Sequence, residues 1–390
     1  MYALLTQLLD IPNYHVISAE IETDKITLDI ESTSQTTACP HCGKTSKTLH
    51  ERHRRMIRDL PISGKPTYLR FIRRRFFCDD CHRAFSESLG FVDERRDYTR
   101  RYQHWIFLQV RENNISAVRR VEQLTYDQIE SIFLHEAGCR IPLTPFADLQ
   151  RLGIDEIALR KGRGNFALIL SNLDTKEIVD VLKSRTQEKL RARLERLSAF
   201  ECAQIQEVAI DMWSPYDAVC AELLPHAVIT ADRFHVMQAV NRELKQLKNQ
   251  QKKVHPQALK GAHYALLKNR QDLTDKQQAT LEHVYQVSPL VKTAHRLKEC
   301  LRHIFECKST KEKAIKRLRK WNLIAEKAGL FPQFRRTLAN WIHRIANYFC
   351  HRTTSGIVEG INNKIKLIKR RAFGFRNFEH FRIRVIAAFL

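Results

Sequence analysis

The sequence lacks any run of 18 apolar residues, so no segment is expected to span a bilayer as a helix. Internal repeats and low-complexity segments are also missing. The first residues, MYALLTQLLDIPNYH, contain neither a charged n-region nor a cleavage site, and we therefore expect no secretory signal. The ten cysteines are then expected in a reducing interior, where disulfides are rare.

Acidic residues are too few to balance the basic ones. The chain of 390 residues has 66 Lys and Arg against 43 Asp and Glu, a net charge of +23. Nucleic acid is the commonest partner of such a surplus. An anionic membrane surface is the competing interpretation, disfavoured because the basic residues lie within structured-looking segments. Hydrophobic residues at 43% argue against wholesale disorder, and the length suits two or three domains.

The pattern along the chain predicts a β-rich start, an α/β middle and a helical remainder. Residues 2–9 suit a short helix, and two alternating segments around Asp24 suit a hairpin. Helical patterns follow from Asp97 to Ala137. Beyond Pro142 and Pro145, strands alternate with helices, which predicts a mixed or parallel sheet. The predicted strands are 152–159, 165–172, 177–184, 208–210 and 227–230. Residues 236–350 and the basic end of the chain read as helical.

Four cysteines form two CxxC pairs, Cys39 with Cys42 and Cys78 with Cys81. Two residues between thiolates let both sulfurs of a tight turn face one metal ion, and Gly43 supplies the positive φ that such a turn needs. Two turns of this kind predict a closed, structural four-cysteine zinc site, with the long insert returning as a hairpin. Two unrelated CxxC pairs, or one redox-active pair, are the alternatives. The other six cysteines are expected to be small buried residues.

The segment around these cysteines is strongly basic. Residues 44–83 contain twelve Lys and Arg against four Asp and Glu, and arginines interleave with aromatic residues. On a strand this pattern gives a partly basic face that could follow DNA phosphates, although a merely solvated face would look the same. The candidates for DNA contact are Arg70, Arg73, Arg74 and Arg75.

A candidate helix-turn-helix follows. Residues 114–122 read as one helix, a break falls at Gln123 and Leu124, and Thr125 caps a second helix. In a helix-turn-helix the second helix enters the major groove, which would place Tyr126 and Gln128 near DNA. Many helix pairs of this form bind nothing, so the neighbouring basic segment is what favours a DNA-binding function.

Two aspartates lie beside apolar strand residues in the predicted α/β region. Asp155 follows Leu-Gly-Ile, and Asp211 follows Val-Ala-Ile. A carboxylate in such surroundings is costly unless a partner or a metal ion compensates it. Asp232, at the end of the next strand, is a weaker candidate for the same site.

A third acid lies far along the chain in an amphipathic helix. Glu359 shares a stripe with Asn363, Lys366 and Arg370, while isoleucines 357, 361, 365 and 368 occupy the opposite face. The acid suits a metal ligand, and the cations suit phosphate contacts. By geometry alone, however, a surface helix with a fortuitous glutamate is the simpler interpretation. The basic candidates for DNA contact are Lys364, Lys366, Lys369, Arg370 and Arg371.

Taken in order, these motifs resemble the ISL3 family of bacterial insertion-sequence transposases. The resemblance rests on CPHCG, CDDC, LGIDE, VAIDMW, ADRFHV and TSGIVEGINNKIKLIKRRAFG, and it runs from about residue 36 to the end. It implies an RNase H-like α/β catalytic domain whose acids are Asp155, Asp211 and Glu359, interrupted by a large α-helical insertion. The resemblance therefore suggests an N-terminal helix and hairpin (1–38), a zinc ribbon (39–90), a helix-turn-helix (91–145), a catalytic domain (146–240 plus 351–390) and an insertion (241–350).

The resemblance further implies a DNA transposase that acts on terminal inverted repeats. Two Mg²⁺ or Mn²⁺ ions would be held by the three acids, and Cys39, Cys42, Cys78 and Cys81 would hold one structural Zn²⁺. Double-stranded DNA and a second copy of the chain, or a larger synaptic assembly, are the implied partners. The implied location is the bacterial cytoplasm, associated with the nucleoid.

Two other functions fit parts of the pattern. A non-catalytic DNA-binding regulator would need the same zinc ribbon and helix-turn-helix, but not three acids in this order. Another nuclease or phosphatase could use paired aspartates on an α/β sheet, but it would not need the basic ribbon. Cleavage of an oligonucleotide in the presence of Mg²⁺ or Mn²⁺ separates these possibilities.

Overall fold

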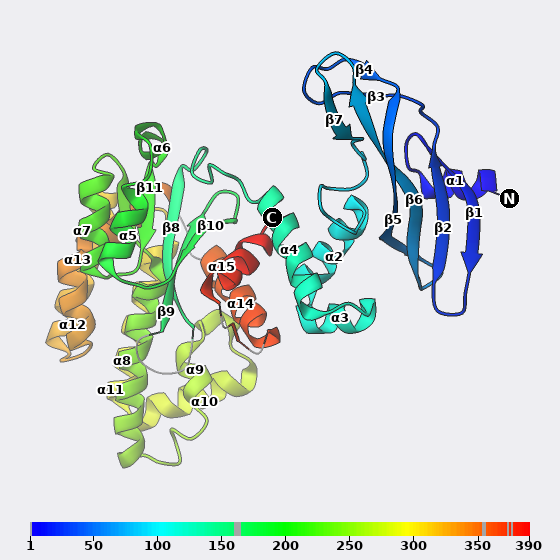
Figure 1. Ribbon diagram of the computed structural model, residues 1–390. Coiled ribbons are helices and arrows are strands. Elements are labelled where there is room, and N and C mark those ends of the chain that lie inside the picture. Colours follow the sequence, from blue (N-terminus) through cyan, green and yellow to red (C-terminus); the bar gives the residue numbers. More distant parts are fainter. Residues whose placement is uncertain (1, 160–164, 353–355, 373, 376) are drawn as a thin grey trace. The chain divides into compact units, whose positions relative to one another are not determined.

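The computed structural model forms two compact units, Met1–Arg140 and Ile141–Leu390 (Figure 1). It describes residues 2–159, 165–352, 356–372, 374–375 and 377–390, with the side chains of 356–359 outside the description. Each unit is described by itself. Within the described residues, none of the helices combines the length and the apolar character needed to cross a membrane.

The first unit begins with a five-stranded sheet in the order β1-β2-β6-β5, with β7 paired to β6. The hairpin predicted around Asp24 is present, and so is the hairpin predicted between the cysteine pairs, as the two long strands β5 and β6. Because β2 also pairs with β6 in parallel, the N-terminal hairpin and the ribbon share one sheet. The elements are α1 (Tyr2–Leu9), β1 (Tyr14–Ile21), β2 (Ile26–Ser32), β5 (Thr48–Ile62), β6 (Lys65–Cys78) and β7 (Arg83–Ser86), with a small pair β3 (Thr37–Ala38) and β4 (Thr45–Ser46).

One face of this sheet is apolar because the side chains of each strand alternate. Leu28, Ile57 and Leu69 are buried on it together with Leu9 of α1 and Val92 of the segment after β7. At about 25 cal/mol per Å² of apolar surface removed from water, this burial is the main stabilising contribution to the sheet. The opposite face remains available for polar and basic residues.

Three helices complete the first unit, and their bounds agree with the predicted helix-turn-helix. Thr99 and Asn114 cap the first two helices through their side chains. Gln123 adopts φ 54°, a left-handed conformation that ends the second helix at the predicted break. The helices are α2 (Arg100–Glu112), α3 (Ile115–Glu122) and α4 (Tyr126–Arg140).

A buried ion pair joins these helices to the sheet. Arg58 of β5 donates to Glu122 of α3 at 3.1 Å, and the two side chains are 6% and 7% exposed. Glu122 also accepts hydrogen bonds from Tyr102 (2.8 Å) and Trp105 (3.3 Å). The charge of Glu122 is therefore tolerated only while its donors are present.

Replacing Arg58 by Met is expected to lower the free energy of unfolding by about 3–5 kcal/mol, because the substitution leaves Glu122 buried without its cation. Urea unfolding of the full chain measures the loss. Arg100→Met is the matched control, because Arg100 pairs with Asp93 at the surface, where an ion pair contributes roughly 0–1 kcal/mol. Equal stability losses in the two variants would contradict the proposed cost of an unpaired Glu122.

The second unit contains the predicted α/β sheet, with the strand order β10-β9-β8-β11-β12. β9 runs antiparallel to both of its neighbours, β8 and β10, whereas β11 and β12 run parallel to β8. The strands are β8 (Arg151–Ala158), β9 (Phe166–Asn172), β10 (Ile178–Leu182), β11 (Glu207–Ile210) and β12 (Val228–Ala231).

Helices cover both faces of this sheet (Figure 1). Ile154 and Leu168 point into one apolar cluster with residues of α5 and α7. Ile157 and Ile169 point into another with Ile365 of α14 and residues of α15. Alternation along β8 therefore directs odd-numbered residues, including Asp155, toward α14. These helices are α5 (Gln187–Leu194), α6 (Ala199–Gln204), α7 (Ser214–Leu223), α14 (Gly356–Arg371) and α15 (Phe378–Ala387).

The long helical region between β12 and α14 packs on the core of the α/β sheet. Its buried residues include Trp321 and Phe334, which belong to the same apolar cluster as Ile210 of β11. Asn347 of this region donates to the carbonyl oxygen of Ile229 in β12 at 2.7 Å. The elements are α8 (Arg233–Val254), α9 (His263–Leu267), the short 3-10 helix Arg270–Asp272, α10 (Asp275–Val287), α11 (Pro289–Glu306), α12 (Lys311–Lys327) and α13 (Pro332–His351).

Candidate active site and metal centre

Asp155 lies in the middle of β8 on the face toward α14, and only 8% of the residue is exposed. Its Oδ1 accepts from the backbone N–H of Glu156 at 2.7 Å. Gly153, two residues earlier on the same face, has no room for a side chain, because a Cβ there would lie 2.6 Å from Ser171 Oγ and 2.7 Å from Leu173 Cδ2. The glycine of the LGIDE motif thus lets Ser171 and Leu173 pack closely against β8 next to Asp155.

The two other aspartates of the region lie at the ends of neighbouring strands. Asp211 directly follows β11, and its Oδ1 accepts from the backbone N–H of Met212 at 2.6 Å. Asp232 directly follows β12, and its Oδ1 caps α8 by accepting from the N–H of Phe234 at 2.9 Å. Because β8, β11 and β12 are parallel, their carboxyl ends lie at the same edge of the sheet.

His235, in the first turn of α8, contacts all three carboxylates. Its Nε2 lies 3.5 Å from Asp155 Oδ1 and 3.8 Å from Asp232 Oδ2, and its Nδ1 lies 3.6 Å from Asp211 Oδ1. Burial opposes the charged ring, but the hydrogen bond to Asp155 and the charges of Asp211 and Asp232 outweigh burial and raise the pKa of His235 to about 9. At neutral pH the ring is therefore an imidazolium between acids.

This environment predicts a specific pH dependence in EDTA. The folded pKa of about 9 exceeds the unfolded value of 6.5, so protonation of His235 stabilises the fold fully below pH 6.5, by about 3 kcal/mol. That contribution is lost as the pH rises through 9. Histidine NMR signals measure the titration, with His295 as internal control, since burial lowers its pKa to about 4. His235→Gln should flatten the stability profile between pH 6.5 and 9, and an unchanged profile would contradict the assignment.

The far end of the chain reaches the same site through α14. Asn362 Nδ2 donates to Asp155 Oδ2 at 2.5 Å, although 207 residues separate the two in sequence. The Oδ1 atom of Asn362 is buried and has no hydrogen-bond partner in the described part of the chain. Glu359 belongs to the same helix, one turn earlier, but its side chain lies outside the described residues.

The predicted amphipathic character of α14 is confirmed for the part that the structure describes. Ile361, Ile365 and Ile368 are buried, and Asn363, Lys366 and Arg370 are exposed. The basic residues of the helix differ in their contacts. Lys364 donates to the carbonyl oxygen of Ala388, and Lys369 donates to that of Ala158. Lys364, Lys366, Arg370 and Arg371 are exposed, and Lys369 is half-buried.

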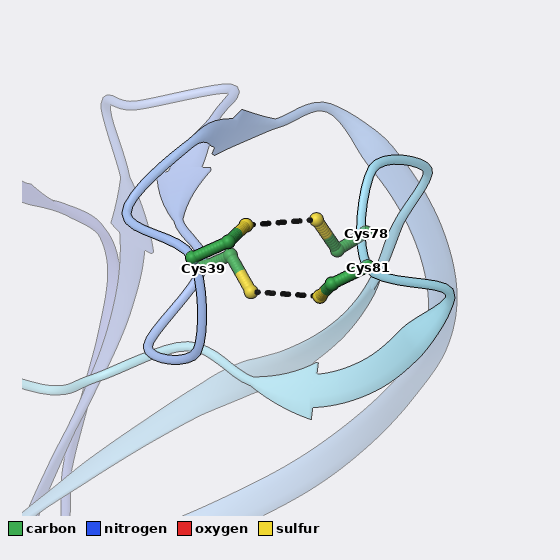
Figure 2. A group of neighbouring side chains, drawn as sticks. Cys39, Cys78 and Cys81 are labelled. Carbon is green, nitrogen blue, oxygen red and sulfur yellow. Dashed lines mark hydrogen bonds between the residues drawn. The ribbon is translucent and has the colours of Figure 1, made fainter.

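The four paired cysteines come together in the first unit. Their sulfur atoms all lie within 4.8 Å of one another, with Cys39 Sγ 3.6 Å from Cys81 Sγ and Cys42 Sγ 3.5 Å from Cys78 Sγ. Figure 2 shows Cys39 on one turn facing the turn that carries Cys78 and Cys81. Tetrahedral zinc with Zn–S bonds of about 2.3 Å separates its sulfurs by roughly 3.8 Å, so the cluster fits zinc.

The backbone of both turns supports this cluster. Gly43 adopts φ 74°, as expected for the turn after the first pair. Burial opposes a thiolate at Cys39, but the N–H groups of His41 and Cys42 donate to its sulfur and lower the pKa of Cys39 to about 7. Lys44 of one turn also pairs with Asp80 of the other at 2.5 Å. By contrast, burial and the neighbouring sulfurs raise the pKa of Cys81 to about 12, and the pKa of Cys42 is raised as well. A bound cation would therefore be needed to hold all four sulfurs as thiolates.

The basic residues predicted to contact DNA in the ribbon have partners within the sheet. Arg70 pairs with Asp29 (2.5 Å) and Glu20 (2.6 Å), Arg74 with Glu87 (2.6 Å), and Arg75 with Glu51 (3.3 Å). Arg73 is half-buried. On the same face as Arg70 and Arg74, Arg52 and Arg54 are exposed and line a groove with them.

In the helix-turn-helix, Tyr126 and Gln128 are exposed at the start of α4, as predicted. The Gln128 side chain accepts from the N–H of Thr125 at 2.9 Å, while the Thr125 hydroxyl accepts from the N–H of Gln128 at 3.2 Å. These reciprocal bonds form a capping box that fixes the start of the second helix. Contacts of both residues with DNA remain a prediction.

Comparison with known proteins places this arrangement in a known class. The profile described as "Transposase" matches residues 152–385, "zinc-finger of transposase IS204/IS1001/IS1096/IS1165" matches 35–81, and "Helix-turn-helix domain of transposase family ISL3" matches 87–137. The order of a zinc ribbon, a helix-turn-helix and a mixed α/β domain with acids at one sheet edge is thus that of an insertion-sequence transposase. The chain belongs to the ISL3 family of transposases.

Two curated relatives agree with this assignment. The chain is 28% identical over 373 residues to the transposase for insertion sequence element IS1001 of Bordetella parapertussis, covering 93% of this chain and 91% of the relative. It is 30% identical over 262 residues to the transposase for IS1557 of Mycobacterium tuberculosis, covering 60% and 58%. The family association implies DNA binding and a DDE-type enzyme.

Two residues of the site were not selected from the sequence. His235 follows Asp232 by three positions at the start of a helix, a spacing that places both on one side of the first turn. Asn362 lies in the same motif as Glu359. Helical spacing from Glu359, however, predicts Asn363 as the polar neighbour of that glutamate. A histidine close in sequence to one acid is common in proteins. His235 is distinguished from such histidines only by its contacts with Asp155 and Asp211, which are distant from it in sequence.

Proposed function

We propose that this chain binds the terminal inverted repeats of an insertion sequence and catalyses DNA cleavage and strand transfer at Asp155, Asp211 and Glu359. The observation that carries the proposal is the meeting of Asp155, Asp211 and α14 at one edge of the sheet. Residues three apart on a helix share a side, so Glu359 is expected next to Asn362 and thus near Asp155. An RNase H-like fold is supported by the strand order and by the parallel placement of β11 and β12.

The donor groups fit hard divalent ions. Carboxylate oxygens are the ligands that Mg²⁺ and Mn²⁺ prefer, and Oδ1 of Asn362, which has no partner among the described residues, offers a further acceptor. Bound there, two such ions would activate the attacking oxygen and stabilise the leaving 3′ oxygen. Asp155, Asp211 and Glu359 would hold these ions.

The protein's own residues orient this site. Asn362 holds one oxygen of Asp155, and the N–H groups of Glu156 and Met212 hold Asp155 and Asp211 from the backbone side. The ring of His235 spans the space between the carboxylates of Asp155 and Asp211. Its imidazolium reduces the repulsion between these acids.

The other domains serve recognition in this proposal. One structural zinc ion held by Cys39, Cys42, Cys78 and Cys81 would fix the turns at the end of the β5–β6 hairpin, and α4 would enter the major groove with Tyr126 and Gln128. Arg70, Arg73, Arg74 and Arg75 of the ribbon, and Lys364, Lys366, Lys369, Arg370 and Arg371 of α14, are the proposed DNA-contacting cations. Cleavage of two element ends in one event favours a homodimer or larger synaptic assembly.

The test is incubation of the purified chain with a labelled duplex from the end of its element in Mg²⁺, Mn²⁺ or EDTA. The expected result is a cut at the element boundary that depends on the divalent ion, followed by joining of the 3′ end to a second duplex. Specific binding without cleavage under every divalent-ion condition would support the regulator instead. Cleavage in EDTA would contradict the metal-dependent mechanism.

A further inference from the structure

The helical region between β12 and α14 has a strongly basic helix that begins at the acid site. Helix α8 contains six Lys and Arg but one acid, Glu243. Glu243 is committed elsewhere, because its carboxylate accepts from the backbone N–H groups of Gln333 (3.3 Å) and Phe334 (2.5 Å) at the start of α13. The cations of α8 therefore have no acid of their own helix available to neutralise them.

Three of these cations form a stripe along one side of α8. Lys245, Lys248 and Lys252 are spaced by three and four residues, which places them on adjacent turns of one side. Glu243 lies on the opposite side, since about 100° separates successive residues. His263 of the neighbouring helix α9 completes the cluster.

The charges within this cluster repel one another. Partial burial and the nearby Lys252 and Lys245 lower the pKa of Lys248. Partial burial and the charges of Lys248 and Lys245 likewise lower the pKa of His263. Like charges held together in this way destabilise the free protein, and a bound polyanion would relieve the repulsion.

We propose that Lys245, Lys248, Lys252 and His263 form a phosphate-binding patch for duplex DNA, here called the α8 patch. The proposal rests on the proposed cleavage of DNA at the acid site. Helix α8 starts at that site with His235, and the exposed Arg242 lies two turns further along on the same side as His235. At about 100° per residue, Lys245, Lys248 and Lys252 lie about 80–140° around the helix from that side. DNA that reaches the acids thus meets Arg242 first and the α8 patch as it winds around the helix.

The helix also sets the distance between the patch and the cleaved bond. At about 1.5 Å per residue, Lys245 lies ~15 Å and Lys252 ~25 Å beyond His235 along the axis. With one phosphate per strand every ~3.4 Å, these distances correspond to roughly 4–8 base pairs. The α8 patch therefore contacts phosphates within the first turn of DNA beside the cut, on the element side or on the flanking side.

The test uses the triple variant Lys245→Gln/Lys248→Gln/Lys252→Gln of the full chain. The matched control is Lys313→Gln/Lys316→Gln/Lys320→Gln on α12, which removes the same charge from exposed lysines at the same helical spacing. Binding is measured without added Mg²⁺ or Mn²⁺ and without a chelator, so that it does not depend on metal ions at the acids and the zinc ion of the ribbon stays in place. The probes are duplexes that contain the cleavage site at the end of the element. In one arm the DNA on the element side of the cut is either 4 or 12 base pairs long. In the other arm the DNA on the flanking side of the cut is either 4 or 12 base pairs long.

The unsubstituted chain is expected to bind about tenfold to a hundredfold more tightly when the DNA on one side of the cut is lengthened from 4 to 12 base pairs. The control variant should show the same gain in affinity. The triple variant should lose that gain, and the slope of log affinity against log salt should fall by about 3. The arm that shows the gain identifies the DNA segment bound.

Equal losses in the triple and control variants, or a gain retained by the triple variant, would overturn the proposal. The double variant Lys245→Gln/Lys252→Gln spares the half-buried Lys248 and covers the case in which the triple variant does not fold. Because binding is scored without added Mg²⁺ or Mn²⁺, absence of cleavage by the unsubstituted chain would refute the proposed function but leave the α8 patch supported.

Discussion

Asp155→Asn is expected to reduce DNA cleavage and strand transfer by about three orders of magnitude or more. The substitution keeps the size of the side chain but removes a buried charge that contacts both His235 and Asn362. Several kcal/mol of transition-state stabilisation depend on a correctly held metal ion, and each 1.36 kcal/mol corresponds to a tenfold change in rate. Cleavage of a labelled element-end duplex in Mg²⁺ measures the effect.

The control for this variant is Asp174→Asn. Asp174 lies in the turn between β9 and β10 and pairs at the surface with Arg151, so its loss leaves the acid site intact. Both variants should bind the element end as the unsubstituted chain does, because recognition is assigned to the first unit. Cleavage retained by Asp155→Asn would refute the assignment of the catalytic acids.

Cys78→Ser is expected to abolish zinc binding and to unfold the turns at the end of the β5–β6 hairpin. Cys78 is 1% exposed and lies 3.5 Å from Cys42 Sγ, so no water or neighbouring group can replace its sulfur without rearrangement. Structural zinc sites in small domains contribute about 10–16 kcal/mol of apparent binding energy, most of which is folding energy. Zinc content should fall from about one ion per chain to near zero.

The Cys78→Ser variant is expected to affect the first unit and to leave the second unit folded. Element-end binding should be lost, whereas the α/β unit, Ile141–Leu390, should keep its own unfolding transition. Cys139→Ser is the matched control, because Cys139 is exposed on α4 of the same unit and lies outside the cluster. A full zinc content in Cys78→Ser would show that another set of ligands holds the ion.

Local patterns explain why the elements of this chain were predictable. The strands of the α/β unit alternate or form short apolar runs, and Asn114 and Thr125 precede helices that they cap. The hairpin between the cysteine pairs followed from the need to bring two distant turns to one metal ion. Each of these features depends on residues that are close together in sequence, so propensity and spacing are sufficient.

Long-range pairing could not be predicted in the same way. The parallel contact of β2 with β6 joins the first hairpin to the ribbon, and nothing in either segment specifies the other as partner. Likewise, Arg70 and Arg74 look like free cations in the sequence, but they pair with Asp29 and Glu87. A DNA phosphate would have to share these two cations with an acid. Charge composition counts residues, whereas tertiary contacts decide which charges remain available to DNA.

Residue type and spacing alone were enough to assign the class of the protein, the cysteine pairs, the alternation that buries one face of the N-terminal sheet and the isoleucine face of α14. The tertiary structure alone decided that His235 lies among three carboxylates and that Asn362 reaches Asp155 across 207 residues. The physical reason is that a site built from separate strand ends and a distant helix exists only after the sheet and its covering helices have packed.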